Sequence, residues 1–285
     1  MEWSLVLASQ DIGHRIDQDE ASGWTLSVSA ADHDRALTHL RLYRQENRRW
    51  QWRRPVTPGL FFDWTSLVWV SLILVFYAWS EARAGSRSAG MLTGAALSGE
   101  GWRLFTATWL HADLAHLSAN AVFGFLFLGL AMGRYGPGVG LLAAYLAGVG
   151  GNALAGWVHD ATARGLGASG VVMGALGLLA IPAAPLPQRT ATFRMVAGSL
   201  MAAALLFVFL GASPESDVIA HFGGFAAGLL LGSLLTLAPR LVHRPPINLA
   251  AGLLFVVLVI LPWWWAMRSG SGLRPDTLSA SHLPL

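Results

Sequence analysis

The chain has 285 residues, of which 54% are hydrophobic and only 12% are charged, and its mean hydropathy is +0.50. Soluble globular domains carry about 25% charged residues, so this composition excludes an ordinary soluble domain and indicates extensive contact with lipid. The sequence has no cysteine, which excludes disulfides, thiol nucleophiles and cysteine-ligated metals. The net charge is +3, and the basic residues, all arginine, gather beside apolar segments. They indicate the flanks of membrane helices rather than a nucleic-acid site.

Residues 1–58 differ from the rest of the chain and predict a small soluble α/β domain with a linker. A mixed segment at 2–9 precedes a first strand near 12–17, and residues 24–28 alternate large and small side chains as a second strand would. Residues 30–47 place apolar side chains along one helical face. We therefore expect a helix, two strands and a helix. An arginine-rich linker follows: Arg44, Arg48, Arg49, Arg53 and Arg54.

Seven apolar stretches follow this linker, at residues 61–79, 115–132, 139–158, 169–184, 195–211, 218–237 and 249–265. Most have the roughly 17–25 residues that a spanning helix needs. The fold class we expect is an all-α polytopic membrane protein with the small α/β domain at its N-terminus. Residues 59–240 would form a six-helix core, 241–268 an additional C-terminal transmembrane helix, and 269–285 a disordered tail.

The arginines between these stretches favour a cytoplasmic N-terminus, because cytoplasmic loops carry the excess of positive charge. The second, fourth and sixth stretches would then all begin on the outer side. Four polar residues lie near those beginnings and therefore at similar depth: His116, Asn120, Ser169 and His221. Ionisable groups inside membrane segments are candidates for function.

Ser169 and His221 have the chemistry of a nucleophile and a general base. The fourth stretch is short, so Ser169 is expected to lie below the membrane surface in a water-filled cavity. The first N–H groups of its helix could stabilise an oxyanion. His116 and Asn120 are four residues apart and share one helical face, from which both could donate hydrogen bonds to that oxyanion. His111, five residues before His116, is expected to point elsewhere and to lie in the outer loop or at the entrance of the helix.

Each of these features alone has a structural explanation. A Gly-x-Ser-Gly sequence is common where membrane helices meet, a lone histidine such as His221 can be a packing residue, and His116 and Asn120 could be interhelical hydrogen-bonding groups. Glycines follow His221 at four-residue spacing and would let the sixth helix approach the fourth closely: Gly224, Gly228 and Gly232. The occurrence of all these features at one depth favours a shared site.

At these residues the chain resembles the rhomboid family of intramembrane serine proteases. The resemblance covers about residues 60–240 and rests on motifs in the family order: Gly101-Trp102-Arg103, His111, His116-x-x-x-Asn120, Gly167-x-Ser169-Gly170 and Ala220-His221-x-x-Gly224-x-x-x-Gly228. It implies a six-helix core with a Ser169–His221 dyad, and an oxyanion site made by His116, Asn120 and the Ser169 N–H. The seventh stretch resembles the family's six-plus-one forms.

The resemblance also implies partners and a location. The substrates would be transmembrane proteins, cut in the lipid bilayer near its outer face, and no metal or cofactor is implied. The small N-terminal domain and the arginine-only composition favour a bacterial inner membrane. Met173 departs from the family pattern, which often has an aromatic residue stacked on the histidine at this position. The oligomeric state stays open.

The sequence bears on two other functions. A catalytically inactive rhomboid-like protein that binds membrane proteins and directs their trafficking is the main alternative, and Met173 is its support. A small-solute transporter would require charged groups in mid-membrane, which the sequence lacks. The sequence also has no His-Glu-x-x-His zinc motif and no aspartate pair on neighbouring stretches.

Overall fold

The computed structural model describes residues 2–19, 23–47, 61–159, 164–181, 189–211 and 217–269. Its contacts divide the chain into two units, Met1–Thr57 and Pro58–Leu285, each of which is described by itself. Of the predicted arginine linker, Arg44 belongs to the helix His33–Glu46, and the part from Arg48 to Arg54 lies outside the described residues, as does the predicted disordered tail beyond Ser269.

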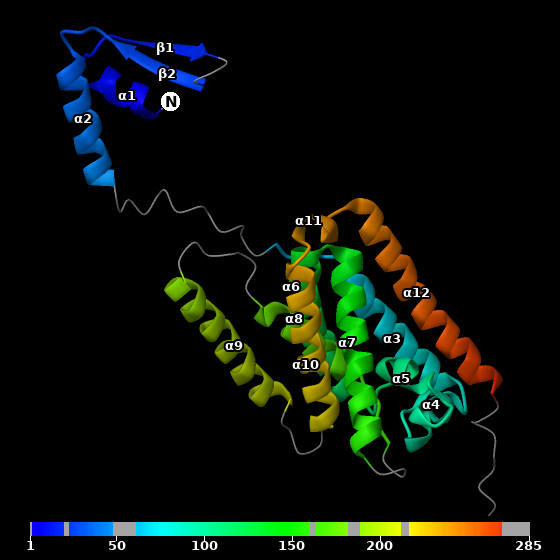
Figure 1. Ribbon diagram of the computed structural model, residues 1–285. Helices are drawn as coiled ribbons and strands as arrows, with labels where there is room; N and C mark the ends of the chain where they lie inside the picture. The colour runs from blue at the N-terminus through cyan, green and yellow to red at the C-terminus, as the bar shows by residue number, and fades with distance from the viewer. Residues whose placement is uncertain are drawn as a thin grey trace, which may run out of the picture. The chain divides into compact units, whose positions relative to one another are not determined.

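Within its described residues, 2–19 and 23–47, the first unit contains two helices and a two-stranded antiparallel sheet (Figure 1). Its elements are α1 (Glu2–Ser9), β1 (His14–Asp19), β2 (Gly23–Val28) and α2 (His33–Glu46). In the register of the hairpin Ile16 pairs with Leu26. The strand begins at His14 rather than at Ile12, because Ile12 packs with Leu7 and Ala36 in the unit's small core. This core is formed by one turn of each helix and the chain between them.

The second unit is helical, and each predicted apolar stretch contains a helix. The long helices are α3 (Ser66–Ala82), α6 (Leu114–Tyr135), α7 (Pro137–Val158), α8 (Ser169–Ala180), α9 (Arg189–Gly211), α10 (Val218–Thr236) and α12 (Pro245–Arg268), and a short α11 (Pro239–Val242) precedes the last of them. Among the described residues four helices are long and apolar enough to cross a membrane, α6, α7, α10 and α12. Helices α3 and α8 are shorter, and so is the apolar part of α9 that the structure describes in full, Ala197–Val208.

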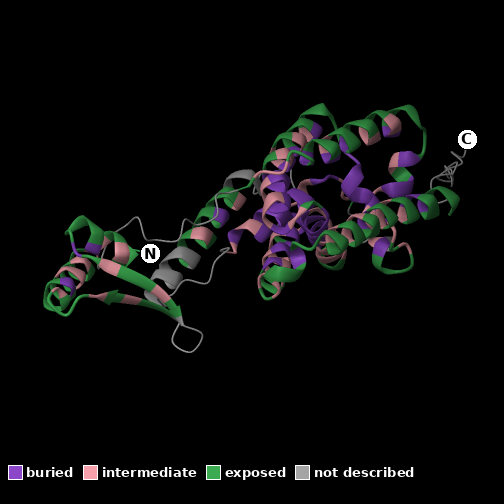
Figure 2. Cartoon of the chain, turned by 90° about the horizontal axis from the view of Figure 1, so that it is seen from above, coloured by how far each residue is buried: buried purple, intermediate pink, exposed green. Residues whose placement is uncertain are grey.

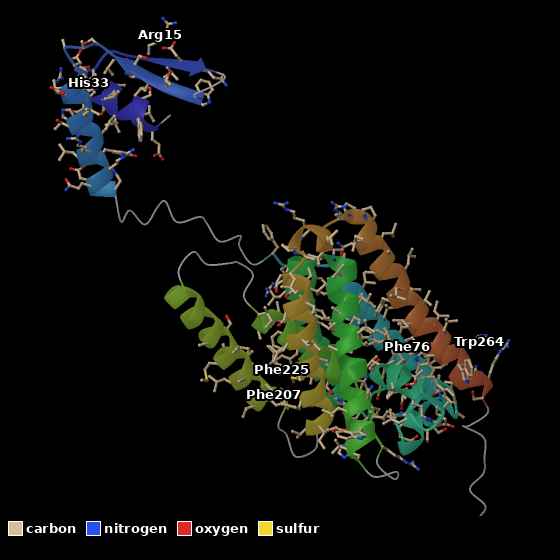
Figure 3. The ribbon with its side chains drawn as sticks, viewed as in Figure 1. Arg15, His33, Phe76, Phe207, Phe225 and Trp264 are labelled. Atoms are coloured by element: carbon tan, nitrogen blue, oxygen red, sulfur yellow. The ribbon has the colours of Figure 1, made fainter. Side chains whose placement is uncertain are left out.

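Helix α8 lies at the centre of this bundle, packed against α6, α7, α9 and α10 (Figure 1). Figure 2 shows buried residues gathered inside the bundle and exposed ones along its outer faces. The exposed side chains of α12 and α3 are largely apolar, as lipid contact requires. Figure 3 shows Phe207 of α9 beside Phe225 of α10, with ring centroids 5.4 Å apart.

Glycines allow α10 to touch α8 backbone to backbone. A Cβ atom added at Gly224 or Gly228 would overlap the carbonyl oxygen of Gly170 or Gly174, respectively. Small residues permit this close approach between membrane helices. The contact brings the first turn of α10 next to the first turn of α8.

The short α8 ends inside the bundle, where α6 satisfies its last carbonyls. Its 12 residues span about 18 Å, well below the roughly 30 Å of a hydrocarbon core. The Tyr135 hydroxyl donates to the Leu178 carbonyl at 3.0 Å, and Arg134 Nη1 lies 3.4 Å from the carbonyl oxygen of Leu179. These donors replace the water that would otherwise satisfy a helix end.

The segment between α3 and α6 folds into four short helices: α4 (Ser86–Gly90), η3 (Gly94–Leu97), α5 (Arg103–Thr106) and η4 (Ala107–Trp109). Arg103 is buried at its centre, where it pairs with Glu100 and donates to the carbonyl oxygens of Ser88 at 2.7 Å and Met91 at 2.8 Å. A buried guanidinium needs such partners. This arginine therefore holds the segment together.

Helix α12 is fixed to the rest of the bundle at both ends. At its start, Asn248 Oδ1 accepts hydrogen bonds from the N–H groups of Gly138 and Val139, both at 3.1 Å, and so caps α7. At its end, Trp263 packs with its ring centroid 5.4 Å from that of Phe76 in α3, a residue labelled in Figure 3.

Candidate active site

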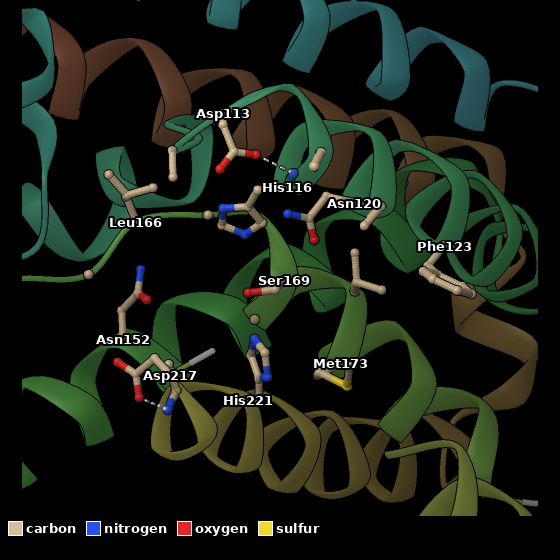
Figure 4. A pocket seen from close by; sticks show the side chains of 18 of the residues that line it. Asp113, His116, Asn120, Phe123, Asn152, Leu166, Ser169, Met173, Asp217 and His221 are labelled. Carbon is tan, nitrogen blue, oxygen red and sulfur yellow. Dashed lines mark hydrogen bonds between the residues drawn. The ribbon is translucent and has the colours of Figure 1, made fainter. Parts of the chain in front are cut away.

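A cavity of about 560 Å³ opens between the first turns of α6, α8 and α10 and is also bordered by α7 (Figure 4). Ser169, His221, His116 and Asn120 all line it. Met173 and the glycines Gly167 and Gly170 line it as well. The residues that the sequence placed at one depth are thus gathered around one cavity.

Ser169 begins α8 at a turn that requires glycine. Gly167 has a φ of +133°, a backbone conformation that other residues rarely adopt. A Cβ atom there would also lie 2.7 Å from Cε1 of His116, so no side chain fits between the loop and the imidazole. The Gly167 N–H donates to the carbonyl of Ala107 at 2.9 Å, which ties the loop to η4.

His221 is in the first turn of α10 and is buried. Figure 4 shows its ring beneath Ser169, with a ring nitrogen directed toward the serine. Gly224 and Gly170 set the separation of the two helices at this level, because the two backbones are in contact there. The serine and the histidine therefore face each other across the α8–α10 contact.

His116 and Asn120 lie on the opposite side of Ser169 from His221 (Figure 4). The first turn of α6 is fixed by Asp113, whose carboxylate accepts a hydrogen bond from the His116 N–H at 2.8 Å. Asn120 Nδ2 is buried and has no hydrogen-bond partner among the described residues. Because an unpaired buried donor is costly, its presence at the cavity wall indicates a donor held for a bound group.

The expectation that His111 points away from His116 was wrong. The two rings pack edge to face with centroids 5.4 Å apart, and His111 is completely buried. The chain is extended at Leu110 and Asp113, so helical spacing does not apply across this stretch. Burial, followed by the neighbouring His116, lowers the pKa of His111 to about 4. His111 is therefore neutral near pH 7 and supports His116 by packing.

Four polar residues that line the cavity were not predicted from the sequence as part of the site: Asp113, Asn152, Arg164 and Asp217. Asn152 of α7 is buried and donates from Nδ2 to the Leu104 carbonyl at 2.7 Å. A carbonyl only accepts, so this bond fixes which way the amide faces. An asparagine among glycines and alanines on a predicted span was the available signal, since polar groups there are scarce.

Met173 is buried one turn after Ser169 and lies beside His221 in Figure 4. Its thioether fills the position at which the resemblance implies an aromatic ring. A methionine can pack against an aromatic ring through its sulfur. Among the described residues, no group of three or more His, Cys, Asp or Glu side chains is arranged to hold a metal ion.

Comparison with known proteins gives a consistent result. Residues 98–238 match the rhomboid domain. The chain is 33% identical over 150 residues to "RHOMBOID-like protein 1" of Arabidopsis thaliana. The aligned residues are 50% of this chain and 36% of that protein. It is 28% identical over 193 residues to "Rhomboid-like protease 3" of Toxoplasma gondii, and there the aligned residues are 63% of this chain and 72% of that protein.

"RHOMBOID-like protein 5" of Arabidopsis thaliana is 32% identical over 147 residues, or 50% of this chain and 46% of the relative. The chain thus spans less than half the length of the Arabidopsis relatives that it matches. The chain is thus similar to rhomboid proteins over about half of its length, and the four helices long enough to cross a membrane among the described residues support a membrane protein.

Proposed function

We propose that this protein is an intramembrane serine protease that cleaves transmembrane proteins through a Ser169–His221 dyad. Ser169 Oγ attacks the peptide carbonyl while His221 accepts its proton. The amine leaves with that proton, and water activated by His221 then attacks the acyl-enzyme and restores the serine. The Ser169 N–H, His116 and Asn120 hold the oxyanion in both steps.

The observation that carries this proposal is the position of Ser169 between His221 on one side and His116 with Asn120 on the other. The histidine lies on one side, and on the other lies Asn120, whose buried Nδ2 has no partner in the described part of the chain (Figure 4). An amide N–H without a partner can donate a hydrogen bond to the negative charge that develops on the carbonyl oxygen of the substrate. The Ser169 N–H is at the beginning of α8, where helix N–H groups are free to donate to such charge.

The same proposal covers the organisation of the chain in the membrane. The core would be six helices, α3 and α6–α10, within residues 59–240, and α12 within 241–268 would be the seventh span. The N-terminal domain of residues 1–58 would lie in the cytoplasm of a bacterium, with the cavity opening toward the outer face of the inner membrane. The printed name of the Toxoplasma relative, a protease, favours the same chemistry.

Met173 favours a second candidate, a catalytically inactive rhomboid-like protein that binds membrane proteins and directs their trafficking. Its flexible side chain restrains the His221 ring less than a stacked aromatic ring would. The intact serine and histidine favour the protease. The two functions differ in whether Ser169 is reactive.

Cleavage of a reporter membrane protein in lipid vesicles tests the proposal. Wild-type protein should cut the reporter, and the Ser169→Ala variant should not. Ser66→Ala is a matched control, because Ser66 is a buried serine at the start of α3 that does not line the cavity. Cleavage by Ser169→Ala at the wild-type rate would refute the protease assignment, and an inert wild type would favour the inactive candidate.

A further inference from the structure

A carboxylate outside the proposed dyad joins two helices at the mouth of the cavity. Asp217 Oδ1 accepts hydrogen bonds from the N–H groups of Ile219 at 3.1 Å and Ala220 at 3.0 Å, and so caps α10. The same oxygen lies 3.0 Å from Nε2 of His159, at the end of α7. Figure 4 shows Asp217 on the first turn of α10, facing the cavity.

The other carboxylate oxygen faces the loop that leads to Ser169. A Cβ atom added at Gly165 would lie 3.8 Å from Asp217 Oδ2. Gly165 is held on its other side by two backbone hydrogen bonds with Leu92, at 2.9 and 3.1 Å. Asp217 therefore contacts the beginning of α10 and the end of α7, and its Oδ2 lies near the loop before α8.

The first turn of α10 carries His221, and the Asp217 carboxylate acts on this residue only through the backbone of that turn. The His221 N–H donates to the Asp217 carbonyl at 3.0 Å. Deeper in the bundle, α7 and α10 touch at Gly151, where a Cβ atom would overlap the Ala220 carbonyl oxygen. His159 lies eight residues, or about 12 Å, further along α7. Two separate contacts with α7 thus restrain the turn from which the His221 ring projects.

We infer that Asp217, tied to α7 by His159, is a positioning residue that aims the His221 ring at Ser169. This inference rests on the proposed protease function and extends it to residues outside the dyad. Neither residue exchanges a proton with the substrate. Their effect is on the orientation of the general base, and small errors in such an orientation slow the chemical step.

The Asp217–His159 pair is partly exposed, and this distinguishes a role in positioning His221 from a role in stabilising the fold. The side chain of Asp217 is 27% exposed and that of His159 is 36% exposed. Exposed pairs of this kind contribute little to the free energy of unfolding. Loss of the His159 contact should therefore change the reaction rate while the melting temperature stays nearly constant.

The test compares His159→Ala and His159→Gln with wild type in vesicles that contain a reporter substrate. His159→Ala should lower kcat about tenfold, within the range of misplacement effects, and leave KM unchanged. His159→Gln should recover most of the rate, because its amide N–H can reach the same carboxylate oxygen. Asp217→Ala should cost more, roughly 100-fold, because it also removes the cap of α10.

The matched control is Asp63→Ala. Asp63 Oδ1 accepts from the Thr65 N–H at 2.9 Å just before α3 begins, and Asp63 does not line the cavity. Its loss should leave kcat unchanged. The double variant His159→Ala/Asp217→Ala should be no slower than Asp217→Ala, because both changes remove one interaction.

A wild-type rate in His159→Ala, no recovery in His159→Gln, or multiplied losses in the double variant would each overturn the inference while the protease assignment stands. A wild-type chain that neither cuts the reporter nor reacts with a serine-directed fluorophosphonate would overturn the proposed function, and this inference with it.

Discussion

Replacement of Gly224 by alanine should separate the two helices that carry Ser169 and His221. The added Cβ would overlap the Gly170 carbonyl oxygen, whereas ordinary contact of this kind is 3.4–4 Å, so the backbones must move apart by on the order of 1 Å. Overpacking of this kind costs about 1–3 kcal/mol. Alanine returns about 1 kcal/mol through its higher helix propensity. The net loss of stability is small, but a 1 Å displacement of the dyad should lower the rate about 100-fold.

Glycines at other positions provide a graded series for this experiment. At Gly232 the nearest atom to an added Cβ is the Leu178 carbonyl oxygen at 3.1 Å, so a shift of a few tenths of an ångström suffices. At Gly252 in α12 nothing lies within 4 Å. We expect Gly224→Ala and Gly228→Ala to lose most activity, Gly232→Ala to lose less and Gly252→Ala to lose none.

The assay measures kcat on the reporter in vesicles, together with the melting temperature of each variant in detergent. Equal activity for Gly224→Ala and Gly252→Ala would refute the reasoning, because it would mean that α8 and α10 do not touch at the level of Ser169.

Three further predictions concern the cavity wall and its supports. Asn120→Ala should lower kcat about 100-fold to 1000-fold with little change in KM, as loss of an oxyanion donor does, whereas an unchanged kcat would exclude that role. Asn248→Ala should lower the free energy of unfolding by about 1–2 kcal/mol because it uncaps α7, while Asn248→Asp keeps the acceptor oxygen. Equal unfolding midpoints for wild type and both variants would contradict this. His111 is neutral in the folded state down to about pH 4, whereas in the unfolded state it binds a proton below about pH 6.5. The free energy of unfolding should therefore decline by up to about 3 kcal/mol as the pH falls from about 6.5 to about 4. His111→Phe should lose less stability over that interval, and equal pH dependence in both proteins would contradict the buried, neutral assignment.

The helices and the cavity-lining positions were largely accessible from sequence, because hydropathy and small-residue spacing report directly on membrane helices. Each apolar stretch contains a helix, and Ser169 begins α8 at a glycine turn as the Gly-x-Ser-Gly pattern indicates. The glycines after His221 contact α8, since only small residues allow such proximity. These features depend on local sequence.

Particular side-chain contacts between segments far apart in the sequence could not be predicted in this way. His159 and Asp217 are 58 residues apart in sequence, and each alone is an ordinary polar residue at a helix end. The packing of His111 on His116 depends on an extended stretch that helical spacing cannot describe. The four short helices between α3 and α6 depend on Arg103 and its carbonyl partners, which come from residues up to 15 positions away.

The rate at which a fluorophosphonate labels Ser169, compared between wild type and His221→Ala, tests most directly whether the two residues act together. Mass spectrometry of the labelled protein locates the modified residue. The account predicts labelling of wild type at Ser169 and a loss of at least about 1000-fold in the histidine variant, since an unassisted serine is a weak nucleophile. Labelling at another residue, or an equal rate in the two proteins, would contradict the account.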